Sequence, residues 1–295
     1  MTDLTDNSAQ DLSSGAVGAI SHSGVPVALP SLSAILWLAW FSFREMSRRK
    51  RLFSLGAISM LPVLVVLSIR IWFPNEGITA QMQLASLSFE VFIPFLIPIA
   101  AMAVGIPAIG EQIDDGTIVF TWTRPIKRRA IFLGRLLAAQ VVATTLMSGA
   151  LVLCFIIMVS QGTDVITWDF LKLYLLTFMI IAVGIFTYAA VFATMGTVFR
   201  KPVLAAILFA FGWENLVTNI PARVQEFGLR FHLQNLIDRP ATVPDDLPGI
   251  LGALLSQALQ RDPVPKLQSV AVLLAVALIA TLVGVYVLRH KEIPN

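Results

Sequence analysis

Six long runs of apolar residues, separated by polar segments, dominate the chain after residue 50. The runs are Leu52–Phe73, Phe89–Gly110, Ile131–Val159, Phe170–Phe199, Val203–Ile220 and Leu267–Leu288. A helix needs about 20 such residues to cross the hydrocarbon core of a bilayer. In lipid, only helices and closed barrels satisfy every backbone polar group. Barrel strands would alternate apolar and polar residues, whereas these runs are continuous. The pattern therefore predicts an all-α membrane protein with six transmembrane helices.

The flanks of these runs divide the chain further. Residues 1–29 are small and polar and lack the basic start and apolar core of a signal peptide, so we expect a disordered cytoplasmic tail. Residues 30–50 combine an apolar stripe with a basic end, which predicts an amphipathic interfacial connecting helix. The alternative, a further span, would need an apolar run longer than Leu32–Phe43. Residues 51–290 then form the six-helix transmembrane domain.

Composition supports a membrane protein and limits other classes. Apolar residues make up 57% of the chain and charged residues 13%, against about a quarter charged in soluble domains. The net charge of +3 is too small to indicate nucleic-acid binding. Cys154 is the single cysteine, so an intrachain disulfide and a cysteine metal cluster are excluded. His22, His232 and His290 are scattered, and we expect no metal site.

The distribution of basic residues predicts the orientation. With both termini in the cytoplasm, fourteen of the 21 Lys and Arg residues fall on the inner side of the membrane. They are Arg44, Arg48, Arg49, Lys50, Arg51, Arg124, Lys127, Arg128, Arg129, Arg135, Arg200, Lys201, Arg289 and Lys291. The opposite orientation would place these clusters outside. We therefore expect a multi-pass protein of the cytoplasmic (inner) membrane.

The sequence also predicts local departures from straight spanning helices, at prolines in the second run and in the long outer connection. Pro94, Pro98 and Pro107 remove backbone donors and should kink or interrupt the second run. The outer connection 221–266 is long, and leucines at helical spacing over 251–259 predict a short amphipathic helix on the outer membrane surface. The segment 226–237 is a second candidate for such a surface helix.

The inner connection between the second and third runs carries the main functional signal. Asp114–Thr117 has the composition of a turn and helix cap, and a short apolar patch follows that includes Phe120 and Trp122. Pro125 disfavours helix at Arg124 and ends the patch. The pattern predicts a short capped helix at the cytoplasmic face. On physical grounds alone, the pattern favours an interfacial linker helix, which many membrane proteins have.

These residues resemble the permeases of the ABC-2 transporter family. The family pattern has a Glu, then Gly-Thr, a hydrophobic stretch, Pro with a basic residue, and Gly-Lys opening the next span. This chain has Glu111, Gly116–Thr117, Pro125, Arg128 and Gly134–Arg135 in that order, with Arg135 in place of the usual Lys. The stretch 43–53 is also similar to the connecting helix of that family. The resemblance covers about Ser31 to His290.

The resemblance implies an ABC-2, type V exporter-like architecture and a coupling helix at about 111–125. That helix would dock on a separate ABC ATPase, present in two copies, which holds the ATP and Mg; this chain would bind no cofactor. The permease would work with a second protomer, as a homodimer or heterodimer in membrane lipid. The candidate ATPase-coupling residues are Glu111, Asp114, Asp115, Gly116, Thr117, Phe120, Trp122, Arg124 and Pro125.

The chain lacks the motifs of an enzyme. No glycine is followed by lysine, so the GxxxxGK[ST] phosphate loop does not occur, and HExxH and GxSxG do not occur either. We expect a transport subunit without catalytic residues of its own, moving a hydrophobic or amphiphilic substrate. The alternative is a secondary transporter driven by an ion gradient. That class usually buries several coupled ionisable groups, and here Glu214 stands nearly alone.

Ionisable residues inside the runs are the remaining candidates. Glu214 lies within the fifth run with Trp213 and Asn215, and spans two and five line the path in the family, so these three are candidate substrate-path residues. The alternative is that this span ends early and leaves Glu214 near outer water. Arg70 and Glu90 either reach separately to the interface or form an outer ion pair.

Overall fold

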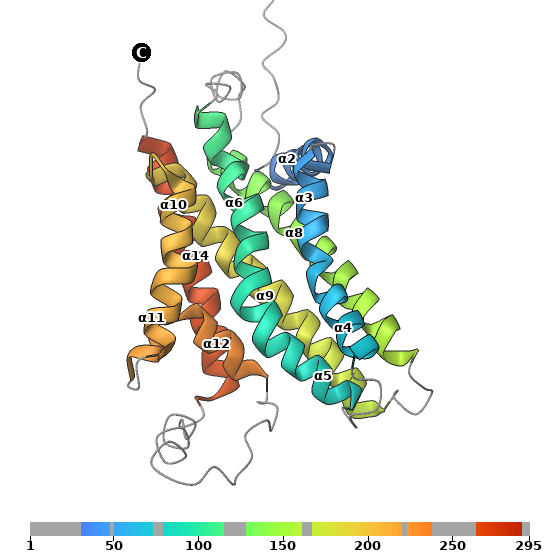
Figure 1. Ribbon diagram of the computed structural model, residues 1–295. Coiled ribbons are helices and arrows are strands. Elements are labelled where there is room, and N and C mark those ends of the chain that lie inside the picture. Colours follow the sequence, from blue (N-terminus) through green and yellow to red (C-terminus); the bar gives the residue numbers. More distant parts are fainter. Residues whose placement is uncertain are drawn as a thin grey trace, which may run out of the picture.

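The computed structural model describes residues 31–47, 50–72, 79–114, 128–160, 167–219, 223–237 and 264–290. This part of the chain is helical throughout, without a strand (Figure 1). In order, the elements are α2 (Ser31–Ser47), α3 (Lys50–Ser59), α4 (Leu61–Trp72), α5 (Ala80–Leu87), η1 (Ser88–Leu96), α6 (Ile97–Asp114), α8 (Arg128–Val159), α9 (Trp168–Val198), α10 (Pro202–Ile207), η3 (Leu208–Trp213), α11 (Glu214–Asn219), η4 (Arg223–Phe227), α12 (Leu229–Leu236) and α14 (Lys266–His290).

Within the described part of the chain, four helices are long and apolar enough to cross a membrane. They comprise Ala80–Gly110, Arg129–Val159, Trp168–Val198 and Lys266–His290. Three shorter apolar helices cover Ile35–Arg44, Leu55–Ile69 and Pro202–Val217. Each of the six predicted runs falls largely within one of these helices. A helix of 31 residues is about 46 Å long, which exceeds the bilayer core and favours a tilted arrangement.

The helix containing Pro94, Pro98 and Pro107 is not interrupted. The elements α5, η1 and α6 follow one another without a gap from Ala80 to Asp114. Pro94 lies inside η1, a wider π-helical segment, in which the backbone hydrogen bonds shift to a longer spacing. The predicted interruption is therefore wrong, while the predicted kink stays a prediction; at Pro94 the π-helical segment accommodates the missing backbone donor.

The helix ends gather at two opposite sides of the molecule. Figure 1 shows α2, the end of α6, the start of α8, the start of α10 and the end of α14 at one side. The ends of α4 and α8 and the starts of α5, α9 and α14 lie at the other. Exposed basic residues mark the first side: Arg44, Arg129, Arg200, Lys201 and Arg289. We call this side the basic end and the other the opposite end.

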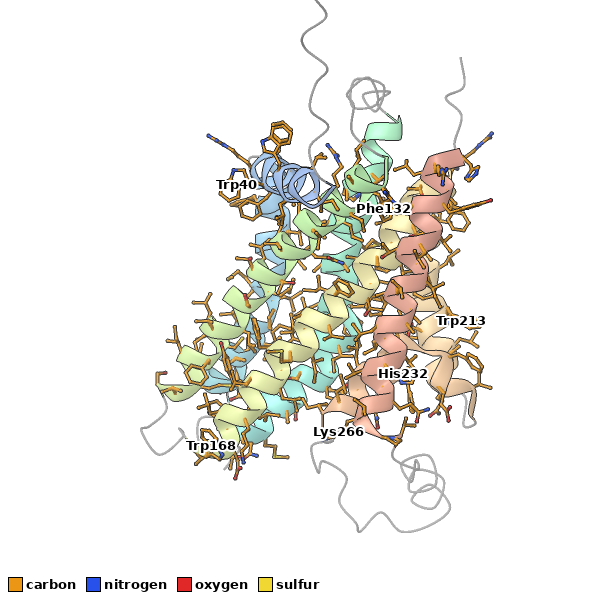
Figure 2. The ribbon with its side chains drawn as sticks, turned by 180° about the vertical axis from the view of Figure 1, so that it is seen from behind. Trp40, Phe132, Trp168, Trp213, His232 and Lys266 are labelled. Atoms are coloured by element: carbon orange, nitrogen blue, oxygen red, sulfur yellow. The ribbon has the colours of Figure 1, made fainter. Side chains whose placement is uncertain are left out.

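Aromatic side chains also mark both sides. On α2, Trp37 stacks on Phe41 and Trp40 on Phe43, with ring centroids 5.8 and 6.1 Å apart. Trp40 is 67% exposed at the basic end, and Trp168 is 69% exposed at the opposite end (Figure 2). Amphipathic rings at both ends are typical of a protein that spans a bilayer.

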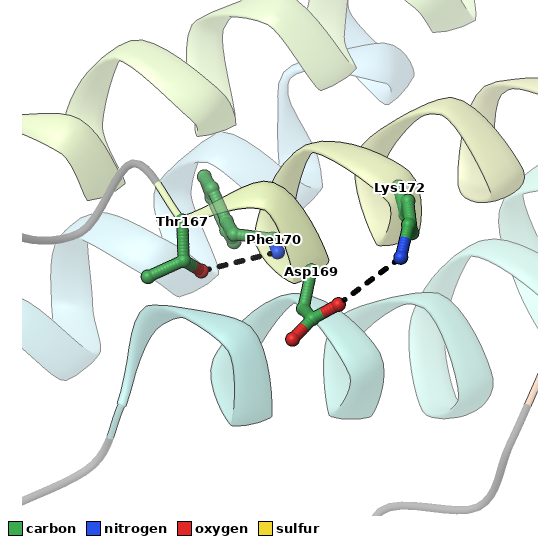
Figure 3. Close-up of polar contacts among 4 residues, drawn as sticks. All are labelled: Thr167, Asp169, Phe170 and Lys172. Carbon is green, nitrogen blue, oxygen red and sulfur yellow. Dashed lines mark hydrogen bonds and ion pairs between the residues drawn. The ribbon is translucent and has the colours of Figure 1, made fainter.

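The start of α9 is stabilised at the opposite end (Figure 3). The Phe170 N–H donates a hydrogen bond to Thr167 Oγ1 at 3.3 Å, which caps the helix. One turn on, Lys172 Nζ lies 3.4 Å from Asp169 Oδ1, and both side chains are largely exposed. This cap fixes where α9 begins.

Two threonines on α9 join it to α14. Thr187 Oγ1 lies 3.4 Å from the Leu273 carbonyl oxygen, and Thr194 Oγ1 lies 2.6 Å from that of Ala280. The two threonines are seven residues apart on α9, and their two carbonyl partners are seven residues apart on α14, so the two helices run in a matched register. Hydroxyl-to-carbonyl contacts of this kind hold helices together where lipid gives no hydrophobic drive.

The segment 226–237 does not lie on the surface as predicted. Its residues form η4 and α12, and most side chains of α12 are buried, including Leu229, His232 and Leu233. The helix packs against α14, η1 and α11. Polar side chains of α12 form hydrogen bonds within the bundle instead. The other predicted surface helix, at 251–259, lies outside the described residues, as does the tail 1–29.

Candidate functional site

The two helices that flank the predicted coupling segment are joined directly. Arg135 on α8 is 7% exposed, and its Nη1 donates to the Ala108 carbonyl of α6 at 3.0 Å. A charge-assisted hydrogen bond between two apolar helices is stronger than a neutral one. It therefore ties the end of α6 to the start of α8, on either side of the connection 115–127.

A second contact fixes α2 against the same helix. At Gly134, an added Cβ would lie 2.8 Å from Leu38 Cβ and 3.0 Å from the Ile35 carbonyl oxygen. Real Cβ contacts are not this short, so only glycine allows α2 to approach α8 so closely. The Gly-Arg pair predicted from the family pattern thus has two structural roles, one for each neighbouring helix.

The third contact joins α6 to α9. An added Cβ at Gly105 would lie 2.9 Å from the Ala189 carbonyl oxygen, and one at Gly196 would lie 2.9 Å from that of Ile106. Small residues that let two backbones touch are a common packing device in membranes. With Gly134 and Arg135, these glycines join α2, α6, α8 and α9 into one unit at the basic end, which we call the basic-end frame.

Two of the predicted coupling residues lie at the end of α6, at the edge of this frame. Glu111 and Asp114 belong to the last turns of α6, and their backbone is described while their side chains are not. The other predicted coupling residues, Asp115, Gly116, Thr117, Phe120, Trp122, Arg124 and Pro125, lie outside the described residues. Their contact with an ATPase stays a prediction. The structure describes the helices α6 and α8 that precede and follow this segment in the chain.

Glu214 occupies a buried site at the N-terminus of α12. It is 1% exposed. The Leu229 N–H donates to its Oε1 at 3.0 Å and the Arg230 N–H donates to its Oε2 at 2.9 Å. Free backbone N–H groups at a helix start favour negative charge, so the carboxylate is satisfied without a metal or a lysine. The predicted alternative, Glu214 near outer water, is wrong for this side chain.

The neighbours of Glu214 add to the contact between α11 and α12. Arg230 Nη1 donates to Asn215 Oδ1 at 2.7 Å, and the hydroxyl of the fully buried Tyr188 lies near the Glu214 carboxylate. Trp213 is half exposed on the outer surface of the chain. The structure brings Glu214 and Asn215 together and turns Trp213 away. Contact of these three residues with a substrate stays a prediction.

Sequence reasoning missed a polar cluster between α12 and α14. His232 Nε2 donates to the Glu226 carbonyl at 2.8 Å, and its Nδ1 lies 3.2 Å from Ser269 Oγ. Asn235 Nδ2 donates to the same Ser269 Oγ at 2.9 Å. Among the described residues, no group of His, Cys, Asp and Glu could hold a metal ion. His232 therefore holds α12 against α14 through Ser269. No residue spacing in the sequence indicated that role.

Of the predicted ion pair between Arg70 and Glu90, the structure describes only the Glu90 side chain. Glu90 lies in η1 and is exposed. Arg70 lies in α4, and its side chain is outside the described part. Both belong to the half of the molecule toward the opposite end. The ion pair stays a prediction.

Comparison with known families agrees with this architecture. The model of the ABC-2 family transporter protein matches residues 36–293. The match covers most of the chain, from α2 to the end of α14. This chain is a multi-pass membrane protein of the ABC-2 transporter family, whose permeases are transport subunits. No curated protein matches the chain.

Proposed function

We propose that this chain is the membrane subunit of an ABC exporter, driven by ATP hydrolysis in a separate ATPase. The family match over residues 36–293 is the observation that carries this proposal. ABC-2 permeases normally work with ABC ATPase partners, which would hold the ATP and Mg. The substrate would be hydrophobic or amphiphilic, since the described spanning helices are lined mostly by aliphatic and aromatic side chains.

The proposed membrane topology has six spans in a type V exporter-like arrangement. The four long helices supply four spans. The pair α3–α4 and the continuous helix α10–η3–α11 supply the other two, with α2 as an interfacial connecting helix. The basic end would face the cytoplasm, because exposed Lys and Arg residues gather there and cytoplasmic flanks are enriched in them. Both termini would then be cytoplasmic.

The proposed coupling site is the segment 111–125. The basic-end frame supports it, since Arg135, Gly134 and Gly196 hold four helices together around that connection. A rigid frame lets movement of the ATPase displace several spans as one body. A second permease protomer and two ATPase copies would complete the transporter.

Affinity purification in mild detergent tests the proposal. The chain should bring along an ATPase subunit, and transport in vesicles should need ATP and persist when ionophores remove the ion gradients. The rival is an ion-driven secondary transporter. A preparation without an ATPase, whose transport stops when the ion gradient is removed, would establish the rival and refute the exporter.

A further inference from the structure

The helix α2 carries an exposed apolar face. Four large side chains on it are at least half exposed: Leu36, Trp37, Trp40 and Phe41. Their spacing of i, i+1, i+4 and i+5 places them on one side of the helix. Large apolar patches on a protein surface mark contacts with other proteins or with membranes. We call these four residues the aromatic face of α2.

The other side of α2 is used within the molecule. Leu38 and Ser42, one helical turn apart, are both buried. Leu38 meets α8 at Gly134, where the two helices approach closely. Since this side of the helix is held against α8, the aromatic face is directed away from it.

The position and charge of α2 indicate what covers the aromatic face. Figures 1 and 2 show α2 lying crosswise to the long helices at the basic end. Arg44 is exposed and follows Trp40 by four residues, so it lies on the same side of the helix. The sequence from 31 to 53 contains one acidic residue, Glu45, and five basic ones: Arg44, Arg48, Arg49, Lys50 and Arg51. An apolar face with a cationic end is complementary to the surface of an anionic membrane.

We propose that α2 binds anionic phospholipids in the leaflet at the basic end. Trp37 and Trp40 lie at the boundary between headgroups and acyl chains, where tryptophan is enriched. Arg44 pairs with a lipid phosphate, which arginine can bind through two parallel hydrogen bonds. A zwitterionic phospholipid carries its own ammonium group beside the phosphate. The cationic end of α2 therefore favours a lipid without that group, such as phosphatidylglycerol.

This inference rests on the proposed interfacial position of α2 and adds the class of lipid that it binds. It does not require the ATPase. Absence of an ATPase after purification would refute the exporter and leave the lipid preference in place. Absence of a lipid preference would refute the binding site on α2 and leave the exporter in place.

Native mass spectrometry of the full chain, purified in detergent without an ATPase, tests the proposal. The chain is mixed with equal amounts of phosphatidylglycerol and phosphatidylcholine that carry the same acyl chains, and the retained molecules of each lipid are counted. Phosphatidylglycerol should be retained in about fivefold excess or more, the factor expected for one basic residue near an anionic surface. Equal retention of the two lipids would overturn the proposal.

Paired charge variants locate the site. The double variant Arg44→Gln and Arg48→Gln should reduce the preference for phosphatidylglycerol to about twofold or less. The double variant Arg200→Gln and Lys201→Gln is the matched control, because it removes two basic residues from the same end of the molecule, between α9 and α10. It should keep about fivefold preference. If the control loses as much preference as the α2 variant, the proposed site is wrong.

The tryptophans separate the apolar contact from the charge. The double variant Trp37→Ala and Trp40→Ala should retain less of both lipids, because the rings contact the lipid whatever its headgroup. Unchanged retention of both lipids would show that the aromatic face contacts something other than lipid, and would contradict the proposal. If a variant does not fold, the comparison of the two lipids on the unaltered chain still decides.

Discussion

At the scale of single residues, Glu214 shows how a buried charge can be accommodated in an apolar helix bundle. Removing a carboxylate from water costs several kcal/mol unless hydrogen bonds compensate. Here both oxygens accept backbone N–H groups at the start of α12. The residue therefore joins the fifth apolar run to the segment that follows it, whatever its part in a substrate path.

Substitution of Glu214 should destabilise the protein. In Glu214→Gln, the amide group brings a donor toward a backbone donor, so one N–H loses its acceptor, at a cost of about 1–3 kcal/mol. Glu214→Ala leaves both N–H groups unsatisfied and opens a small void, so its loss should be larger. Thermal unfolding in detergent measures both changes.

Asp169→Asn is the matched control for these variants. Asp169 is an exposed carboxylate whose partner, Lys172, is also exposed, and surface ion pairs contribute about 0–1 kcal/mol. Equal unfolding temperatures for Glu214→Ala and Asp169→Asn would show that the contact to α12 contributes little.

The sequence pointed to Glu214 because a charge within an apolar run is conspicuous. It did not predict the partners, which lie 15 and 16 residues further on, beyond a chain reversal that no local pattern specifies. The contacts of His232 and Asn235 with Ser269 were likewise not predicted, because they depend on which helix packs opposite.

At the scale of elements, glycines determine how closely the helices approach. Gly134 and Gly149 lie on the same helix, α8, in opposite settings. A Cβ at Gly134 would meet α2, whereas a Cβ at Gly149 would meet nothing within 4 Å. The two positions therefore separate the packing effect of glycine from its effect on helix propensity.

The variants Gly134→Ala and Gly149→Ala should change stability in opposite directions. Gly134→Ala forces α2 away from α8, and overpacking of this kind costs about 1–3 kcal/mol. Gly149→Ala removes only the entropic penalty of a helical glycine and should stabilise by about 0.5–1 kcal/mol. Thermal unfolding of the two variants beside the unaltered chain measures the difference. Changes of the same sign and size would contradict the close contact of α2 and α8.

Apolar runs predicted the long helices well, since about 20 apolar residues leave the backbone few alternatives in lipid. The same rule could not predict the π-helical segments η1 and η3, where hydrogen bonds shift by one residue. The surface helix predicted at 226–237 was wrong, because Arg230, His232 and Asn235 form hydrogen bonds within the bundle. Polarity alone does not distinguish a surface helix from a buried one with satisfied donors.

At the scale of the whole molecule, the basic-end frame would let movement of an ATPase be transmitted to several spanning helices. The direct bond between Arg135 and the Ala108 carbonyl lies beside the connection 115–127. The glycine contacts extend the frame to α2 and α9. A partner that moves this connection would therefore act on four helices, and through the contacts of α9 on α14 as well.

Recovery of an ATPase with the affinity-purified permease tests the central claim most directly. The double variant Asp114→Lys and Asp115→Lys reverses the charge at the proposed docking segment and should recover about tenfold less ATPase than the unaltered chain. Asp169→Lys, a charge reversal at the opposite end, should recover the same amount as the unaltered chain. Full recovery with the Asp114 and Asp115 variant would contradict the coupling site, and failure of the unaltered chain to recover any ATPase would contradict the account as a whole.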